Sequence, residues 1–199
     1  MVIKNIITKS IENSYSYQEY RTLVENLLKE GKSTSKEDSE MMVNYSKLNH
    51  SRMKRLDKTV KLSQEVIEKV ESIIAPIEWI VLAEGWCGDA AQNLPIINKL
   101  ADLNSNINLR IVLRDEHPEL MDQFLTNGGK SIPKLIHVES EYSTIKSWGP
   151  RPTVATKMVA DYKAKHGSIT PEFKKDLQVW YNKDKGLSTV EDMMTFLGL

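Results

Sequence analysis

Residues 77–90 read IEWIVLAEGWCGDA, and this stretch decides the fold that we expect for the chain. Its first seven residues form a continuous apolar run of strand length, typical of a strand that is covered on both faces of a sheet. After Cys87 and Gly88, the sequence DAAQNLPIINKLADL has the apolar spacing of a helix interrupted by Pro95. Cys87 is therefore expected at a helix N-terminus, beside backbone N–H groups that stabilise a thiolate.

Cys87 is the only cysteine among the 199 residues, and Ala90 occupies the position where a second cysteine would complete a dithiol site. A disulfide scaffold is therefore excluded. The histidines are scattered singly and one cysteine cannot complete a zinc site, so we expect no metal and no other cofactor. A lone cysteine is most often a small buried hydrophobe, but a position between a strand end and a helix start favours contact with a ligand.

The charge balance argues against several classes of partner. With 27 Lys and Arg against 27 Asp and Glu, the formal net charge is +0, which supplies no global attraction for nucleic acid or an anionic membrane. No run approaches the ~18 apolar residues of a membrane helix, and residues 1–16 do not have the pattern of a secretory signal. We therefore expect a cytoplasmic protein that binds neither nucleic acid nor membrane, and its oligomeric state stays open.

The periodicity of the apolar residues divides the chain into three zones. Residues 1–62 are predicted to form a helical extension packed on the core, because its apolar stripes would otherwise be exposed. One stripe ends at Gly31 and a second continues at about the same period; their members are Tyr20, Leu23, Val24, Leu27 and Leu28, then Met41, Tyr45, Leu48, Leu56 and Val60.

Residues 63–150 alternate between helix and strand, and residues 151–199 are again helical. Further strands are predicted within residues 107–113, 133–139 and 142–148, and helices within residues 62–73 and 117–125. In the last zone, Thr170 and Ser188 are expected to start helices. The chain is thus predicted to be one compact α/β domain, a mixed sheet flanked by helices, with helical extensions at both ends.

These segments resemble the thioredoxin-like superfamily over residues 63–150. AEGWCGD, residues 83–89, resembles the Ala-Glu-Trp-Cys-Gly-Pro-Cys motif with Gly85 as an insertion, and Pro95 matches the kinking proline of the active-site helix. GGKSIPKLI, residues 128–136, resembles the segment that holds the family's cis-proline, which would be Pro133. Asp89 replaces a common proline, so the resemblance is to the Trp-Cys-Gly-Asp subgroup, with the resolving cysteine replaced by Ala90.

The resemblance implies a monothiol exchange protein. Cys87 would attack a disulfide and form a mixed disulfide, which an external thiol must resolve because Ala90 cannot. The partner would be a disulfide-containing protein or a low-molecular-weight thiol. The partner-binding residues would be Trp86 at the border of the site, the Ile132 backbone and cis-Pro133 through strand-like hydrogen bonds, and Trp148 and Gly149.

The ionisation of Cys87 decides between this mechanism and its alternative. The helix dipole is expected to lower the pKa of Cys87 by about one unit from ~8.5, against the repulsion of Asp89. Three cationic candidates for tuning follow the second and fourth predicted strands: Arg114, His117 and Arg151. The alternative is a non-catalytic binding module for a peptide or a small thiol, which a buried or unshifted Cys87 would favour.

Overall fold

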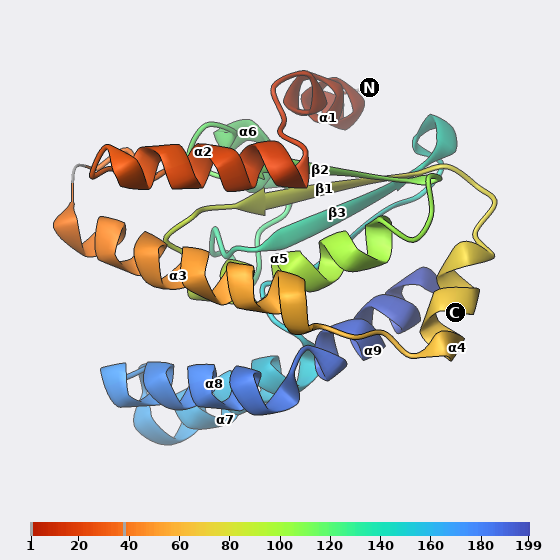
Figure 1. The fold of residues 1–199 in the computed structure, drawn as a ribbon. Coiled ribbons are helices and arrows are strands. Elements are labelled where there is room, and N and C mark those ends of the chain that lie inside the picture. Colours follow the sequence, from red (N-terminus) through yellow and green to blue (C-terminus); the bar gives the residue numbers. More distant parts are fainter. Residues whose placement is uncertain (1, 38) are drawn as a thin grey trace.

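A four-stranded mixed sheet lies at the centre of the computed structural model, which describes residues 2–37 and 39–199 (Figure 1). Its strands are β1 (Ile77–Ala83), β2 (Ile107–Leu113), β3 (Lys134–Glu139) and β4 (Ile145–Trp148). Their spatial order is β2-β1-β3-β4, with β1 parallel to β2 and β3 antiparallel to both β1 and β4. The prediction of an α/β fold with a mixed sheet and helical extensions at both ends is confirmed.

Strand β1 is covered on both faces, which explains its continuous apolar sequence. Trp79 and Val81 belong to one hydrophobic cluster, whereas Ile80 and Leu82 belong to another. Successive side chains of a strand point to opposite faces, so both sets are removed from water. This central strand ends at Ala83, directly before the segment that carries Cys87.

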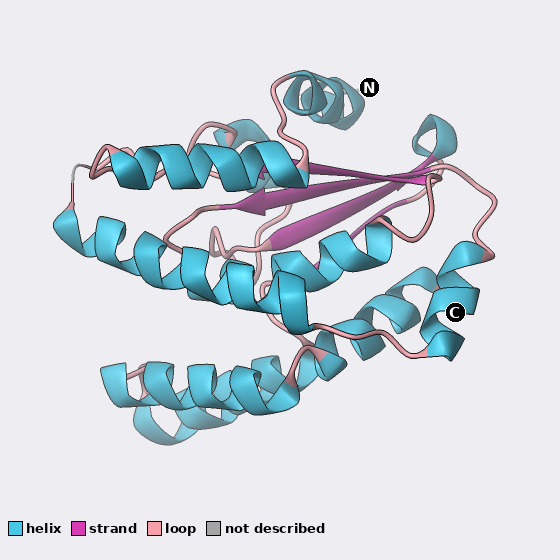
Figure 2. Cartoon of the chain, viewed as in Figure 1, coloured by secondary structure: helices cyan, strands magenta, loops and turns pink. Residues whose placement is uncertain are grey.

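Helices pack on both faces of the sheet (Figure 2). The cluster that contains Trp79 takes residues from α2 (Tyr17–Lys29), α3 (Glu40–Thr59), α4 (Gln64–Glu71), α5 (Gly88–Ala101) and α9 (Leu187–Leu197). The cluster that contains Ile80 takes residues from α1 (Val2–Glu12) and α6 (Pro118–Gln123). The extensions therefore share the hydrophobic core of the sheet.

Helix α3 buries a different face from the one that its apolar residues indicate. Met41, Tyr45 and Leu48 are exposed, so the prediction that they form an inward stripe is wrong. The buried face consists of Val43, Ser46, Asn49, Met53 and Leu56. Asn49 is polar because α3 crosses the loop that precedes Cys87, where the Asn49 side chain donates to the Gly85 carbonyl oxygen.

The C-terminal extension begins with a pair of helices that has a small core of its own. Helices α7 (Thr153–His166) and α8 (Pro171–Asp184) enclose a cluster that includes Phe173 and Leu177. Thr170 caps α8 as predicted, because its hydroxyl accepts a hydrogen bond from the Phe173 N–H. The predicted start of the last helix at Ser188 is wrong: Ser188 lies inside α9, and its hydroxyl donates to Asp184 of α8.

Candidate functional site

Cys87 occupies the N-cap position of α5, at the carboxyl end of β1. The Ala90 N–H donates to its Sγ over 3.4 Å, and the thiol donates to the carbonyl oxygen of Ile132 over 3.3 Å. The side chain is half-buried, in contact with both hydrophobic clusters of the sheet. The predicted location of the cysteine at a helix start is confirmed, and Pro95 lies inside that helix.

The prediction of an activated thiol is wrong, because burial raises the pKa of Cys87 to about 12. The negative charge of Asp89 raises the pKa further, while the N–H groups of Ala90 and Asp89 and the guanidinium of Arg151 lower it. Desolvation of the thiolate outweighs the helix terminus. At neutral pH Cys87 is therefore a thiol, which agrees with its hydrogen bond to a carbonyl group.

Asp89 and Arg151 lie next to Cys87 as an ion pair. Their Oδ2 and NH2 atoms are 2.7 Å apart, and the Tyr181 hydroxyl donates to the other carboxylate oxygen over 3.0 Å. Burial raises the pKa of Asp89, and Arg151 opposes that rise. Sequence reasoning placed both ionic residues at the site but missed Tyr181, which reaches Asp89 from α8 and belongs to no recognisable motif.

The Ile132–Pro133 peptide is cis and lies against Cys87. Ile132 is 6% exposed and Pro133 is buried, so little of this segment is open to a partner. Gly149 packs on it with φ +113°, and a Cβ at that position would overlap the Pro133 carbonyl oxygen. Trp148 is directed toward α9, where its Nε1–H donates to Asp192 over 2.8 Å.

Arg114 is at the site, whereas His117 contacts a different part of the molecule. The Arg114 guanidinium lies 4.9 Å from the ring centroid of Trp86, and its Nε is 2.7 Å from a carboxylate oxygen of Asp115. His117 Nδ1 lies 3.2 Å from the Ser10 hydroxyl of α1, beside a cavity of about 390 Å³ between α1 and the start of α6. The structure therefore groups Trp86 with Arg114 and places His117 with the N-terminal helix.

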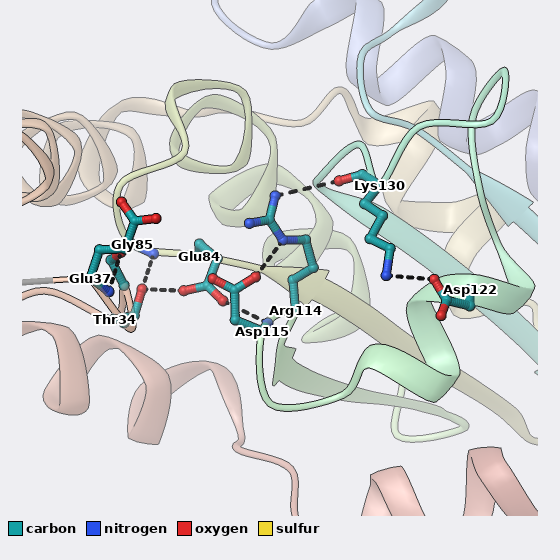
Figure 3. Close-up of polar contacts among 9 residues, drawn as sticks. Thr34, Glu37, Glu84, Gly85, Arg114, Asp115, Asp122 and Lys130 are labelled. Atoms are coloured by element: carbon teal, nitrogen blue, oxygen red, sulfur yellow. Dashed lines mark hydrogen bonds and ion pairs between the residues drawn. The ribbon is translucent and has the colours of Figure 1, made fainter.

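Glu84 is a buried carboxyl group three residues before Cys87 that sequence reasoning missed. It accepts hydrogen bonds from the Thr34 hydroxyl and from the Asp115 N–H, the latter over 3.1 Å (Figure 3). Burial raises its pKa to about 7. Its carbonyl oxygen accepts from the Cys87 N–H over 3.0 Å, so the turn that presents the thiol is anchored at Glu84. The only signal in the sequence was an acidic residue directly after an apolar strand.

The described residues offer thiol and hydrogen-bonding chemistry at this site. No group of His, Cys, Asp and Glu side chains able to hold a metal ion occurs in the part of the chain that the structure describes. Over the same residues, no helix is both long and apolar enough to cross a bilayer. Trp86, Cys87, Gly88 and Asp89 are all half-buried, so part of this segment is exposed to solvent.

Comparison with known proteins agrees with the fold. A family model described as thioredoxin matches residues 35–163, which include α3 as well as the sheet. A protein of unknown function from Pseudomonas aeruginosa has a similar structure, with a TM-score of 0.58 and 16% identity over 92% of this chain and 98% of that one. An HIV epitope scaffold gives a TM-score of 0.56 and 17% identity, covering 87% and 96% of the two chains.

No curated protein sequence matches the chain. At such low identity the two structures show the fold alone, whereas the family model spans more than half of the 199 residues. This chain belongs to the thioredoxin family.

Proposed function

We propose that this chain is a thioredoxin-fold binding protein for a small thiol, in which Cys87 contacts the ligand without turnover at neutral pH. The observation that carries the proposal is the Cys87 thiol itself, hydrogen-bonded to the Ile132 carbonyl oxygen with its pKa raised to about 12. The sequence of residues 86–89 supports the proposal that the chain belongs to the Trp-Cys-Gly-Asp subgroup. A reducing compartment such as the cytoplasm suits a protein with one protonated thiol.

The expected rate of exchange favours binding over catalysis. At pH 7 a thiol with this pKa is ~3000-fold less ionised than an ordinary cysteine of pKa ~8.5. A more basic thiolate is a better nucleophile, with a Brønsted slope of about 0.4–0.5. This higher nucleophilicity recovers only ~30-fold to 60-fold of the rate that is lost through lower ionisation. Attack on a disulfide should therefore be on the order of a hundredfold slower than attack by a free cysteine.

The surroundings of the cis peptide favour a small ligand over an extended peptide. The Ile132 carbonyl oxygen already accepts the Cys87 thiol, and both Ile132 and Pro133 are buried. An incoming strand would have to share that carbonyl oxygen with the Cys87 thiol and reach a buried segment before it could pair with the Ile132 backbone. The half-buried segment from Trp86 to Asp89 is the surface that remains for a ligand.

Monothiol exchange is the second candidate, and the N-cap position of Cys87 favours it. The Ala90 N–H and the Arg151 guanidinium both lower the pKa of the thiol, so they stabilise a thiolate once it forms. Because position 90 is Ala, the resulting mixed disulfide would wait for an external thiol.

Two measurements with glutathione separate the candidates. We expect reduced glutathione to produce saturable NMR shifts of the Gly88 and Ala90 amides, and oxidised glutathione to leave the mass of the protein unchanged at pH 7. The Cys87→Ser variant is the control for any adduct. Rapid formation of a mixed disulfide by the wild type at pH 7 would replace the binding proposal by monothiol exchange, and neither binding nor adduct would refute both.

A further inference from the structure

Arg52 of α3 and Gln178 of α8 converge on the backbone of Gly88, the residue after Cys87. A Cβ built on Gly88 would lie 3.3 Å from Gln178 Nε2 and 3.6 Å from Arg52 NH1. Both atoms are hydrogen-bond donors, and they come from the two helical extensions rather than from the sheet. The absence of a side chain at residue 88 leaves both donors close to the first turn of α5.

Buried amides hold the two donors in place. Asn49 is 1% exposed; its Nδ2 donates to the Gly85 carbonyl oxygen over 3.0 Å, and its Oδ1 accepts from Arg52 NH1 over 2.8 Å. Gln92 is 2% exposed, and its Nε2 donates to Gln178 Oε1 over 2.9 Å. Because each donor is fixed by a buried partner, little side-chain entropy is lost when a ligand binds.

Arg52 has no ion-pair partner among the residues that the structure describes. No carboxylate among residues 2–37 and 39–199 lies within ion-pair distance of it, and burial together with Arg55 lowers its pKa. Asp89, the acid that follows Gly88 in the sequence, is engaged by Arg151 and Tyr181. An arginine remains charged at all relevant pH values, so the site presents a half-buried cation close to Gly88, the residue after the cysteine.

We propose that Arg52, Gln178 and the Gly88 backbone form a subsite for a carboxylate of the ligand, which is therefore an anionic low-molecular-weight thiol. The inference rests on the proposed function, because the subsite would bind the carboxylate of the same ligand whose thiol contacts Cys87. A guanidinium can bind a carboxylate through two parallel hydrogen bonds, and the amide of Gln178 adds a third donor. The ligand would thus reach the cysteine between the two helical extensions.

The test compares an anionic with a cationic thiol. We expect the wild type to bind reduced glutathione at least tenfold more tightly than cysteamine, with an affinity that falls as salt is added. Arg52→Gln should reduce the glutathione affinity about tenfold and leave that for cysteamine unchanged. Arg55→Gln is the matched control: it removes the same charge from the same helix, but Arg55 donates to Asn182 and should leave glutathione affinity within about twofold.

Each outcome decides the subsite separately from the proposed function. Equal affinities for the two thiols, unaffected by Arg52→Gln, would overturn the subsite and leave the binding function standing. If neither thiol binds, the proposed function fails, and acetate, which has the carboxylate without the thiol, then tests the subsite alone. A saturable acetate shift of the Gly88 amide that is lost in Arg52→Gln supports the subsite, and no shift overturns it. Gly88→Ala is a second variant that changes the subsite, because the added Cβ would meet both donors. The backbone of Gly88 does not have a left-handed φ, so alanine can adopt it.

Discussion

Asp89 is the charge that most strongly opposes ionisation of Cys87, after burial itself. We expect Asp89→Asn to lower the pKa of Cys87, because the repulsion disappears and Arg151 loses the carboxylate that neutralises it. Each unit of pKa changes the thiolate population about tenfold at a pH below both values. Because a less basic thiolate is also a weaker nucleophile, the rate of iodoacetamide alkylation at pH 8 should rise about threefold to fourfold for each unit by which the pKa falls.

Asp102→Asn is the matched control for this change. Asp102 caps the opposite end of α5 and accepts from the Asn98 side chain, so its removal takes one charge from the same helix far from the thiol. The alkylation rate of Cys87 in the Asp102→Asn variant should equal that in the wild type. Equal rates for Asp89→Asn and the wild type would show that Asp89 does not control the cysteine.

Glu84 is expected to make the stability of the protein depend on pH. Its folded pKa of about 7 lies above the value of 4.5 in an unfolded chain, so the folded state retains a proton that the unfolded state releases. Stability is therefore full below pH 4.5 and falls as the pH rises to 7. Between pH 5 and pH 8 this group should lower the free energy of unfolding by on the order of 2 kcal/mol.

Comparison with Glu84→Gln isolates that contribution from those of other groups. The carboxyl group faces Thr34 from the N-terminal extension, Arg114 and Asp115 from the end of β2, and Tyr20 from α2. Urea denaturation at both pH values should show a smaller loss of stability in the variant than in the wild type. Identical pH dependence in the two proteins would place the Glu84 carboxyl in an ordinary ionised state.

At the residue scale, the sequence predicts where a residue lies within a helix or strand better than it predicts how buried and how ionised that residue is. The position of Cys87 follows from local periodicity, but its ionisation depends on how Ile132 and the neighbouring helices exclude water. Tyr181 and Arg52 reach the site from helices far away in the chain, where no local pattern marks them. His117 was grouped with the site because it follows the second predicted strand, but its ring contacts Ser10 of α1 instead.

The approach of Gly149 to Pro133 fixes how β4 continues past the cysteine. Gly149→Ala should destabilise the protein by at least about 3 kcal/mol, because a Cβ would overlap the Pro133 carbonyl oxygen at a φ of +113°. Thermal or urea unfolding measures the loss. Gly128→Ala is the control: its φ of +77° is also left-handed, but nothing lies within 4 Å of the added atom, so we expect a loss of only about 1 kcal/mol.

At the scale of elements, strands were easier to predict than the buried faces of helices. β1 carries apolar residues on both faces, so its sequence predicts a buried strand whichever of its faces is considered. In α3, Asn49 belongs to the buried face because its side chain donates to the Gly85 carbonyl oxygen, and the spacing of apolar residues does not indicate such a hydrogen bond. Prediction fails there because the helix packs against a functional loop instead of a purely apolar surface.

The whole molecule is expected to fold as one unit, with residues 1–62 as part of its core. Helices α2 and α3 contribute Tyr20, Val24, Met53 and Leu56 to the cluster that contains β1 and α5. Deletion of residues 1–62 would expose that cluster and remove the partners of Glu84 and Gly85. We therefore expect aggregation or loss of the near-ultraviolet circular dichroism signal.

A double substitution on the outer face of α3 provides the control for that deletion. Met41→Ser with Tyr45→Ser changes two exposed side chains and should leave the free energy of unfolding within about 0.5 kcal/mol of the wild type. A truncated chain that stays soluble and cooperatively folded would instead establish the N-terminal helices as an independent appendage.

The central claim is that the fold holds Cys87 as a protonated contact residue, and the pH dependence of its alkylation tests that claim most directly. The cysteine is unique in the sequence, so intact-mass measurement of iodoacetamide labelling reports on one thiol alone. We predict that labelling at pH 7 is slower than that of a free cysteine and is still accelerating above pH 10, because the pKa is about 12. An apparent pKa at or below the ordinary value of ~8.5, with labelling at pH 7 as fast as that of a free cysteine or faster, would contradict the account.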